Sequence, residues 1–114
     1  MLPEDWVVAD CHDGYEFSAP VGSFIPNNFG VYDVLGNVAE WVGDCWDSSY
    51  ENSPRDGSAR VSGNCNRPIL RGASYYDMPL YLRSSNHYGF ESKQSENKET
   101  RYINFGFRVL REIN

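Results

Sequence analysis

The oxygen atoms between Asp33 and Glu40 are the first candidates for chemistry in this sequence. The segment DVLGNVAE carries a carboxylate at each end and a glycine near its centre. Calcium binds about six to eight oxygens, which carboxylates and backbone carbonyls can supply. In an extended chain, carbonyls two residues apart point to the same side, so those of Gly36 and Val38 can face one ion. Because Gly36 also lets the backbone turn sharply, the segment is a candidate calcium site.

An alternative gives the same two carboxylates structural roles. Asp33 then caps a turn, and Glu40 pairs with an arginine such as Arg83 or Arg108. An arginine among apolar residues is normally a fork-shaped hydrogen-bond donor that ties loops together, and Arg71 has the same setting. Composition alone favours this structural alternative over calcium.

Three cysteines allow either a disulfide or free thiols. Cys45 and Cys65 bracket a loop of polar and turn-forming residues, and a bond between them would stabilise the fold by roughly 3 kcal/mol. Cys11 is then left without a partner. In a reducing compartment all three stay thiols, so a Cys45–Cys65 disulfide and three free thiols are equal alternatives.

The remaining patterns exclude several classes of function. His12 and His87 stand in unrelated segments, and the sequence has no Ser/His/Asp signature, phosphate-binding loop or CxxC pair. The formal net charge is −6, without a cluster of Lys or Arg, so we expect no nucleic-acid partner. No apolar run approaches the ~20 residues of a membrane span, so we expect no membrane association. The start, MLPEDWVVAD, is not a signal peptide, and the compartment stays unknown.

The elements that must position these residues are short. The 114 residues suit one domain, 1–114, and 15 % aromatics with ten Gly and six Pro favour many turns and few helices. We expect strands or strand fragments at 19–24, 38–42, 68–71, 80–90 and 105–109, a helical turn within 30–35, and loops at 43–66 and 91–101.

Four separated segments resemble one known family. They read APVGSF (19–24), FGVYDVLGNVAEW (29–41), LRGASYYDMPLYLRSS (70–85) and NFGFRVLR (104–111). In this order they are similar to the C-terminal half of the sulfatase-modifying-factor domain, the fold of formylglycine-generating enzyme. The resemblance implies an α+β fold with little regular secondary structure, a variant of the C-type lectin fold, here truncated at its N-terminus. A partial domain exposes surface, so we expect a homo-oligomer or a compact remnant.

The resemblance also implies metal ligands. The structural calcium ligands of the family match Asp33, Gly36, Val38 and Glu40, which shifts our expectation from ion pairing to calcium at this segment. A second calcium site of the family is represented only in part, by Asp13 and Tyr15.

Formylglycine-generating enzymes bind copper through two cysteines that follow their GGS motif. The matching segment here, 72–83, contains no cysteine, and the two cysteine positions fall near Asp77 and Leu82. Thiolates are the ligands that Cu(I) prefers, so we expect neither copper nor the oxidase chemistry. Proton transfer by Asp77 with a neighbouring tyrosine is a less favoured alternative.

The resemblance further implies that the segment 75–90 faces a ligand. The candidate ligand residues are polar or aromatic and are Tyr75, Tyr76, Asp77, Tyr81, Asn86 and Tyr88. Exposed tyrosines make good contact surfaces because they lose little entropy on binding, although the same rings can instead fill a small core. We therefore predict a non-catalytic, calcium-stabilised binding or scaffold module with an unknown protein or small ligand. The alternatives are one part of a sulfatase-modifying oxidoreductase whose other half is a separate chain, or a truncated remnant.

Overall fold

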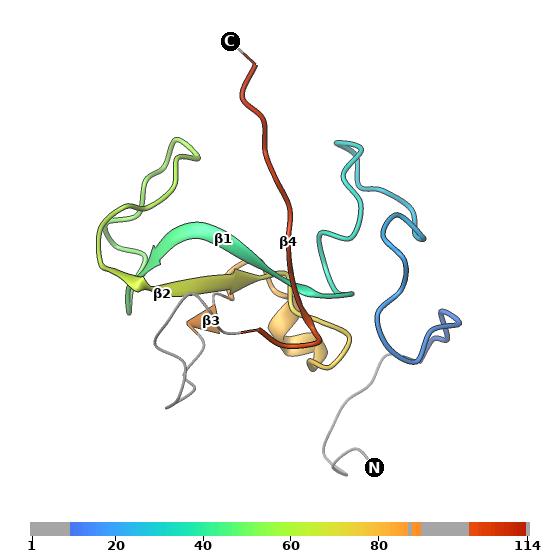
Figure 1. Cartoon of the computed structure of the whole chain (residues 1–114). Helices are drawn as coiled ribbons and strands as arrows, with labels where there is room; N and C mark the ends of the chain where they lie inside the picture. The colour runs from blue at the N-terminus through green and yellow to red at the C-terminus, as the bar shows by residue number, and fades with distance from the viewer. Residues whose placement is uncertain (1–9, 87, 90–100, 114) are drawn as a thin grey trace.

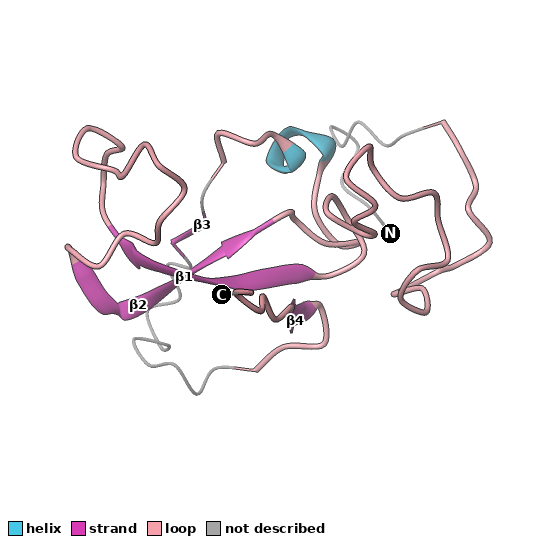
Figure 2. Ribbon diagram, turned by 90° about the horizontal axis from the view of Figure 1, so that it is seen from above, coloured by secondary structure: helices cyan, strands magenta, loops and turns pink. Residues whose placement is uncertain are grey.

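One four-stranded sheet, in the order β3-β2-β1-β4, organises the chain (Figure 1). The computed structural model describes residues 10–86, 88–89 and 101–113. The elements in chain order are β1 (Ala39–Trp46), β2 (Asn64–Arg71), the 3-10 helix η1 (Pro79–Leu82), β3 (Tyr88–Gly89) and β4 (Phe105–Phe107). β1 pairs antiparallel with β2 and parallel with β4, while β2 pairs antiparallel with β3. Loops surround this sheet on several sides (Figure 2).

The pairing of β1 with β2 changes along its length. The register is regular up to Val42, opposite Ile69, and shifts before Cys45, opposite Pro68. Proline has no backbone N–H to donate, so the hydrogen-bond ladder is interrupted there. Cys45 forms a disulfide with Cys65. The covalent link therefore joins the two strands where their hydrogen bonding is irregular.

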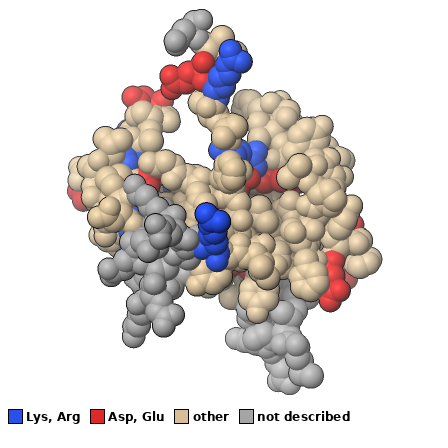
Figure 3. All heavy atoms as spheres, viewed as in Figure 1, with Lys and Arg blue, Asp and Glu red and all other residues tan. Residues whose placement is uncertain are grey.

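The core is small and includes parts of β1, β2 and the segment that follows β2. Its buried apolar residues are Ala19, Ala39, Cys45, Ile69, Leu70 and Ala73. Many larger apolar side chains are open to solvent instead, and Ile25, Phe29 and Ile113 are each at least 90 % exposed. Uncharged residues cover most of the face shown in Figure 3. Exposed apolar surface on this scale usually marks a place where a protein contacts a partner.

Two predicted strands are confirmed, as is the scarcity of regular secondary structure. β1 begins at Ala39 and β2 ends at Arg71, although both extend further toward the disulfide than the sequence predicts. The chain turns at Gly72 with φ +87°, where a Cβ would lie 2.8 Å from the carbonyl oxygen of Val34. In the described part of the chain, η1 is the single helical element. No helix among those residues is long and apolar enough to cross a membrane.

Three other predictions of local structure are wrong. Residues 19–24 form a turn, because the side chains of Asn37 and Asp33 accept backbone N–H groups that a strand ladder would need. Residues 30–35 contain no helical turn. Within 80–90, the described residues form the end of η1 and the two residues of β3 instead of one strand.

The C-terminal strand is shorter and more exposed than the sequence predicts. β4 ends at Phe107, opposite Trp41, and beyond it the chain leaves the sheet (Figure 1). The ring of Phe105 packs edge-on against Trp41, with 5.3 Å between centroids. Phe107 and Val109, expected on the same buried side, are 75 % and 86 % exposed. The alternation of apolar residues therefore predicted the strand correctly, but it did not predict that one face of the strand would be exposed.

Candidate functional site

The segment after β2 rests on the loop before β1. Gly36 donates its N–H to the carbonyl of Gly72 (2.8 Å), and Tyr75 donates its N–H to the carbonyl of Asn37 (2.9 Å). The side-chain amide of Asn37 accepts from the N–H of Ala19 (2.9 Å) and donates to its carbonyl (3.2 Å). Asn37 has φ +62°, a left-handed value that asparagine tolerates better than most residues. Asn37 therefore holds three chain segments together at one end of the sheet.

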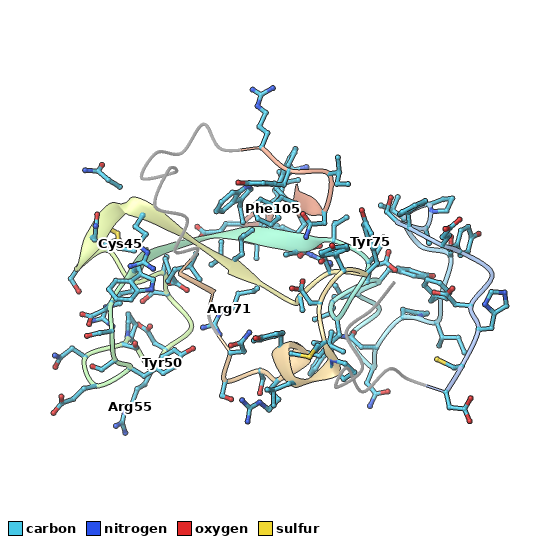
Figure 4. The ribbon with its side chains drawn as sticks, turned by 90° about the horizontal axis from the view of Figure 1, so that it is seen from below. Cys45, Tyr50, Arg55, Arg71, Tyr75 and Phe105 are labelled. Carbon is cyan, nitrogen blue, oxygen red and sulfur yellow. A yellow bond between two sulfur atoms is a disulfide. The ribbon has the colours of Figure 1, made fainter. Side chains whose placement is uncertain are left out.

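These segments enclose a hollow of about 570 Å³, which we call the aromatic hollow. Its aromatic lining residues are Phe17, Phe24, Tyr75 and Tyr76. Its acidic lining residues are Asp13, Asp33 and Asp77, and the described lining residues include no Lys, Arg or His. Tyr75 lies at the opposite end of the sheet from Cys45 (Figure 4). The volume suits a small-molecule site.

Three rings of the aromatic hollow follow one another at right angles. The centroids of Phe17 and Tyr75 lie 5.9 Å apart with their planes at 84°. The centroids of Tyr75 and Tyr76 lie 6.5 Å apart with their planes at 83°. Phe17 is 62 % exposed and Tyr76 is 68 % exposed. Both residues are therefore largely exposed to solvent rather than buried in the core.

Asp77 closes a tight turn beside these rings. Its Oδ2 accepts hydrogen bonds from the N–H (2.7 Å) and the hydroxyl (2.6 Å) of Ser74. Ser74 is buried, and its hydroxyl oxygen also accepts from the amide of Asn104 (3.0 Å). No described residue hydrogen-bonds to the second oxygen of Asp77, Oδ1. That oxygen is therefore available to a ligand while the first one fixes the side chain.

The resemblance places the two copper-binding cysteines of the family near Asp77 and Leu82, and both of these residues line the aromatic hollow. A carboxylate and an aliphatic side chain do not supply the soft thiolates that Cu(I) prefers. Cys11 also lines the hollow, as an exposed free thiol. One thiol does not make a thiolate pair, so the residues present do not fit the copper site of the family.

The predicted ligand residues fall into two groups. Tyr75, Tyr76 and Asp77 share the aromatic hollow, whereas Tyr81 and Asn86 do not line it. Asn86 instead donates from its side-chain amide to the carbonyl of Tyr81 (3.0 Å). The backbone carbonyl of Asn86 accepts a hydrogen bond from Arg71 (2.7 Å). Arg71 also donates to the carbonyl of Ser84 (3.1 Å) and to the hydroxyl of Tyr50 (3.0 Å). Tyr88 belongs to β3. The second group therefore contributes to the loop that Arg71 ties to the sheet.

A guanidinium faces the oxygens of the predicted calcium site. Arg108 donates from Nε and an Nη to the two carboxylate oxygens of Glu40, both at 2.5 Å. It also donates to the carbonyls of Tyr32 and Asp33, both at 3.0 Å. Hydrogen bonding to Glu40, then attraction by Glu40 and Asp33, raises the pKa of Arg108 above its ordinary value. Of the two arginines considered from the sequence, Arg108 is the one that pairs with Glu40.

Both carboxylates of the predicted calcium site have hydrogen-bond partners within the chain. Asp33 accepts the N–H of Gly22 through Oδ2 (2.8 Å), which is the capping role considered from the sequence. No group of three or more His, Cys, Asp or Glu in the described chain is placed to hold a metal ion. Calcium at Asp33, Gly36, Val38 and Glu40 therefore stays a prediction, and it requires Glu40 to exchange Arg108 for the ion.

The second predicted calcium site contains a local turn. Asp13 accepts the N–H of Tyr15 through Oδ1 (2.9 Å), and both residues are exposed. Asp13 reaches the aromatic hollow, but Tyr15 does not line it; its ring packs edge-on against Phe24 at 6.1 Å. Among the described residues, Asp13 receives a hydrogen bond on one of its two carboxylate oxygens.

A buried arginine that the sequence analysis did not single out organises the loop between β1 and β2. Arg60 is 7 % exposed, bonds to the carbonyl of Ser49 (2.8 Å) and the hydroxyl of Ser53 (3.3 Å), and pairs with Asp47. A hydrogen bond from the N–H of Ser49, together with attraction by Arg60, lowers the pKa of Asp47. Nothing in the sequence distinguishes Arg60 from the neighbouring Arg55.

Sequence reasoning also missed part of the aromatic hollow. Phe17 lies two residues before the turn at 19–24, and Phe24 is the last residue of that segment. Asn37 follows the glycine of the GNV motif. An asparagine after a glycine is a signal for a residue in the left-handed conformation, so Asn37 could have been singled out from the sequence. The two phenylalanines carried no signal, since they come next to the site only through the fold.

A model of the family described as the sulfatase-modifying factor enzyme 1-like domain matches residues 3–113. The formylglycine-generating enzyme of Streptomyces coelicolor is 32 % identical over 113 residues, covering 92 % of this chain and 32 % of the relative. The inactive C-alpha-formylglycine-generating enzyme 2 of Mus musculus is 38 % identical over 66 residues, covering 57 % of this chain and 17 % of the relative.

One solved structure is also similar. PvdO from Pseudomonas aeruginosa gives a TM-score of 0.61 and 50 % sequence identity over 67 % of this chain and 29 % of that chain. The chain spans about a third or less of the length of these relatives.

Proposed function

The chain belongs to the family of the sulfatase-modifying factor enzyme 1-like domain, and on this premise we propose that it is a non-catalytic binding module whose ligand occupies the aromatic hollow. One observation supports this most. The resemblance puts the two copper cysteines near Asp77 and Leu82, and both of these residues line the hollow. The chain therefore has a cavity near these positions but no pair of thiolates in it. We further propose that the frame is the lectin-like variant that the resemblance implies.

The names of the relatives agree with this division between fold and chemistry. One relative carries the name of the active enzyme, and another is named an inactive form of it. The family therefore includes members that are described as lacking the reaction. We propose that this chain is a further such member, with the exposed rings of Phe17 and Tyr76 serving binding instead.

The proposal includes a structural calcium ion only on a stated condition. The ion would take oxygens from Asp33 and Glu40 and from the carbonyls of Gly36 and Val38, so Arg108 must leave Glu40 first. An ion that binds only the folded chain raises its stability by mass action. A rise in melting temperature with calcium, reversed by chelator, would support the ion, whereas identical curves would leave Arg108 as the group that holds this loop.

The non-catalytic part of the proposal is tested by asking whether the hollow takes up Cu(I). The background is Cys11→Ser, which removes the free thiol at the rim. A chromophoric Cu(I) chelator competes with the protein under anaerobic conditions. We expect the Cys11→Ser chain to take no copper from the chelator. We expect the triple variant Cys11→Ser, Asp77→Cys, Leu82→Cys to bind one Cu(I), because it restores two thiolates to one cavity.

The same variants are then mixed with a cysteine-containing sulfatase peptide and copper. Mass spectrometry follows the conversion of the peptide cysteine. Copper-dependent conversion by the chain with its native Asp77 and Leu82 would refute the non-catalytic proposal. Absence of conversion together with copper uptake by the triple variant alone would support it, since the cavity is then shown to be intact.

The second candidate is one part of a larger modifying enzyme. The exposure of Ile25, Phe29 and Ile113, each at least 90 %, favours it because such side chains are normally covered. Size-exclusion chromatography with light scattering separates the outcomes. A folded monomer that stays soluble at high concentration would argue against both an obligate partner chain and a homo-oligomer. A defined dimer or larger species would support self-association.

A further inference from the structure

We propose that the ligand of the aromatic hollow is an organic cation, an amine or quaternary ammonium ion attached to an apolar or aromatic body. This rests on the proposed binding function and adds the chemical class of the ligand. The inference comes from two independent properties of the lining, its charge and its rings.

The charge of the hollow is one-sided. Its three carboxylates each have one oxygen held by a backbone N–H, from Tyr15, Gly22 and Ser74, at 2.9, 2.8 and 2.7 Å. None of the described lining residues is a Lys, Arg or His. Arg108 does not line the hollow; it donates to the carbonyl of Asp33, is attracted by the Asp33 carboxylate, and pairs with Glu40. Among the described residues, the hollow therefore presents three carboxylates, and Arg108 partly offsets the charge of Asp33 from outside the lining.

The rings supply the second property. The ring of Tyr75 lies nearly perpendicular both to the ring of Phe17 and to the ring of Tyr76, and all three rings line the hollow. A cation within about 6 Å of a ring centroid is attracted by the negative face of the ring. Perpendicular rings beside carboxylates are the arrangement that recognises alkylated ammonium groups. The lining also carries Leu35 and Met78, which suit an apolar body rather than a bare ion.

Other ligand classes fit the same lining less well. An anion would meet three carboxylates without a compensating base. A metal ion needs several ligands at one point, and the described residues provide no such group of three. A neutral aromatic molecule would use the rings but leave the charge unused. The organic cation is the class that uses both properties together.

Three probes of similar size test the proposal by isothermal titration at two salt concentrations. They are benzyltrimethylammonium as the cation, benzyl alcohol as the neutral compound and phenylacetate as the anion. We expect benzyltrimethylammonium to bind at least about tenfold more tightly than either of the others, and its affinity to fall as salt rises. The whole 114-residue chain is used.

Two variants locate the binding, with one matched control. Asp77→Asn keeps an oxygen for Ser74 but removes the charge, and Tyr76→Leu keeps apolar volume but removes the ring face. Each variant is expected to lower the affinity for benzyltrimethylammonium by about fivefold. Asp56→Asn removes a carboxylate outside the hollow that likewise closes a short turn, with Ser58. This control is expected to leave the affinity unchanged.

The possible outcomes separate this inference from the proposed function. Equal binding of all three probes, weakened by Tyr76→Leu, would refute the cationic ligand but keep the hollow as a binding site. Cation binding that neither hollow variant changes, or that Asp56→Asn weakens equally, would refute it as general attraction to an acidic protein. No binding of any probe by a folded chain would refute the inference and weigh against the proposed function as well.

Discussion

Replacing Arg108 with glutamine should destabilise the folded chain, because the variant loses a defined set of hydrogen bonds. The variant loses two charged hydrogen bonds to Glu40 and two bonds to the carbonyls of Tyr32 and Asp33. The Arg108 side chain is 40 % exposed and that of Glu40 is 19 % exposed, so screening limits the ion pair to about 1 kcal/mol. The two carbonyl bonds add about 0.5 kcal/mol each. We expect a loss of about 2 kcal/mol and a melting temperature lower by about 10 °C.

Urea unfolding followed by tryptophan fluorescence measures this loss. Arg111→Gln is the matched control, because Arg111 is an exposed arginine on the same tail and has no hydrogen bond with described residues. A double-mutant cycle with Glu40→Gln should return about 1 kcal/mol of coupling. The raised pKa of Arg108 means that its contribution is complete below the ordinary pKa of arginine and is lost only as pH rises beyond its folded value. Equal stability of Arg108→Gln and Arg111→Gln would refute the reasoning.

Three further perturbations probe the rest of the fold. Reducing the Cys45–Cys65 disulfide should cost about 3 kcal/mol in urea unfolding, while Cys11→Ser changes nothing; an unchanged midpoint after reduction contradicts this. The pKa of Asp47 is lowered from 3.8, so its stabilisation is present above that pH and lost as pH falls below it. Asp47→Asn should flatten acid unfolding, and an unchanged acid limb would exclude this residue. Gly72→Ala should cost about 2 kcal/mol, because its Cβ meets a carbonyl oxygen and its φ is positive; a wild-type melting curve would disprove that.

Much of the frame could be predicted because it depends on local chemistry. Trp41 lies in an apolar, aromatic run that favours a strand, and Gly72 marks the place where β2 ends. The polar loop between Cys45 and Cys65 also made a disulfide between them one of two equal alternatives. These features depend on residue type within a few positions of the chain, or on a covalent bond with few alternatives.

The partners of charged groups could not be chosen from the sequence. Glu40 had two candidate arginines and a candidate ion, and its pairing with Arg108 depends on β4 lying parallel to β1. Arg60 is buried through contacts across a turn-rich loop, so its sequence neighbours gave no sign of that burial. Phe17 reaches the aromatic hollow for the same kind of reason. Contacts between segments that are distant in the sequence decide all three.

The central claim, that the aromatic hollow is the ligand site, is tested most directly by mapping where a ligand perturbs the backbone. Amide chemical shifts of the labelled chain are recorded during titration with benzyltrimethylammonium. We predict the largest saturable shifts at Phe17, Tyr75, Tyr76 and Asp77, with little change in residues 47–60, which follow β1 at the Cys45 end of the sheet (Figure 4). Shifts that centre on residues 47–60, or that spread evenly over the surface without saturating, would contradict the claim.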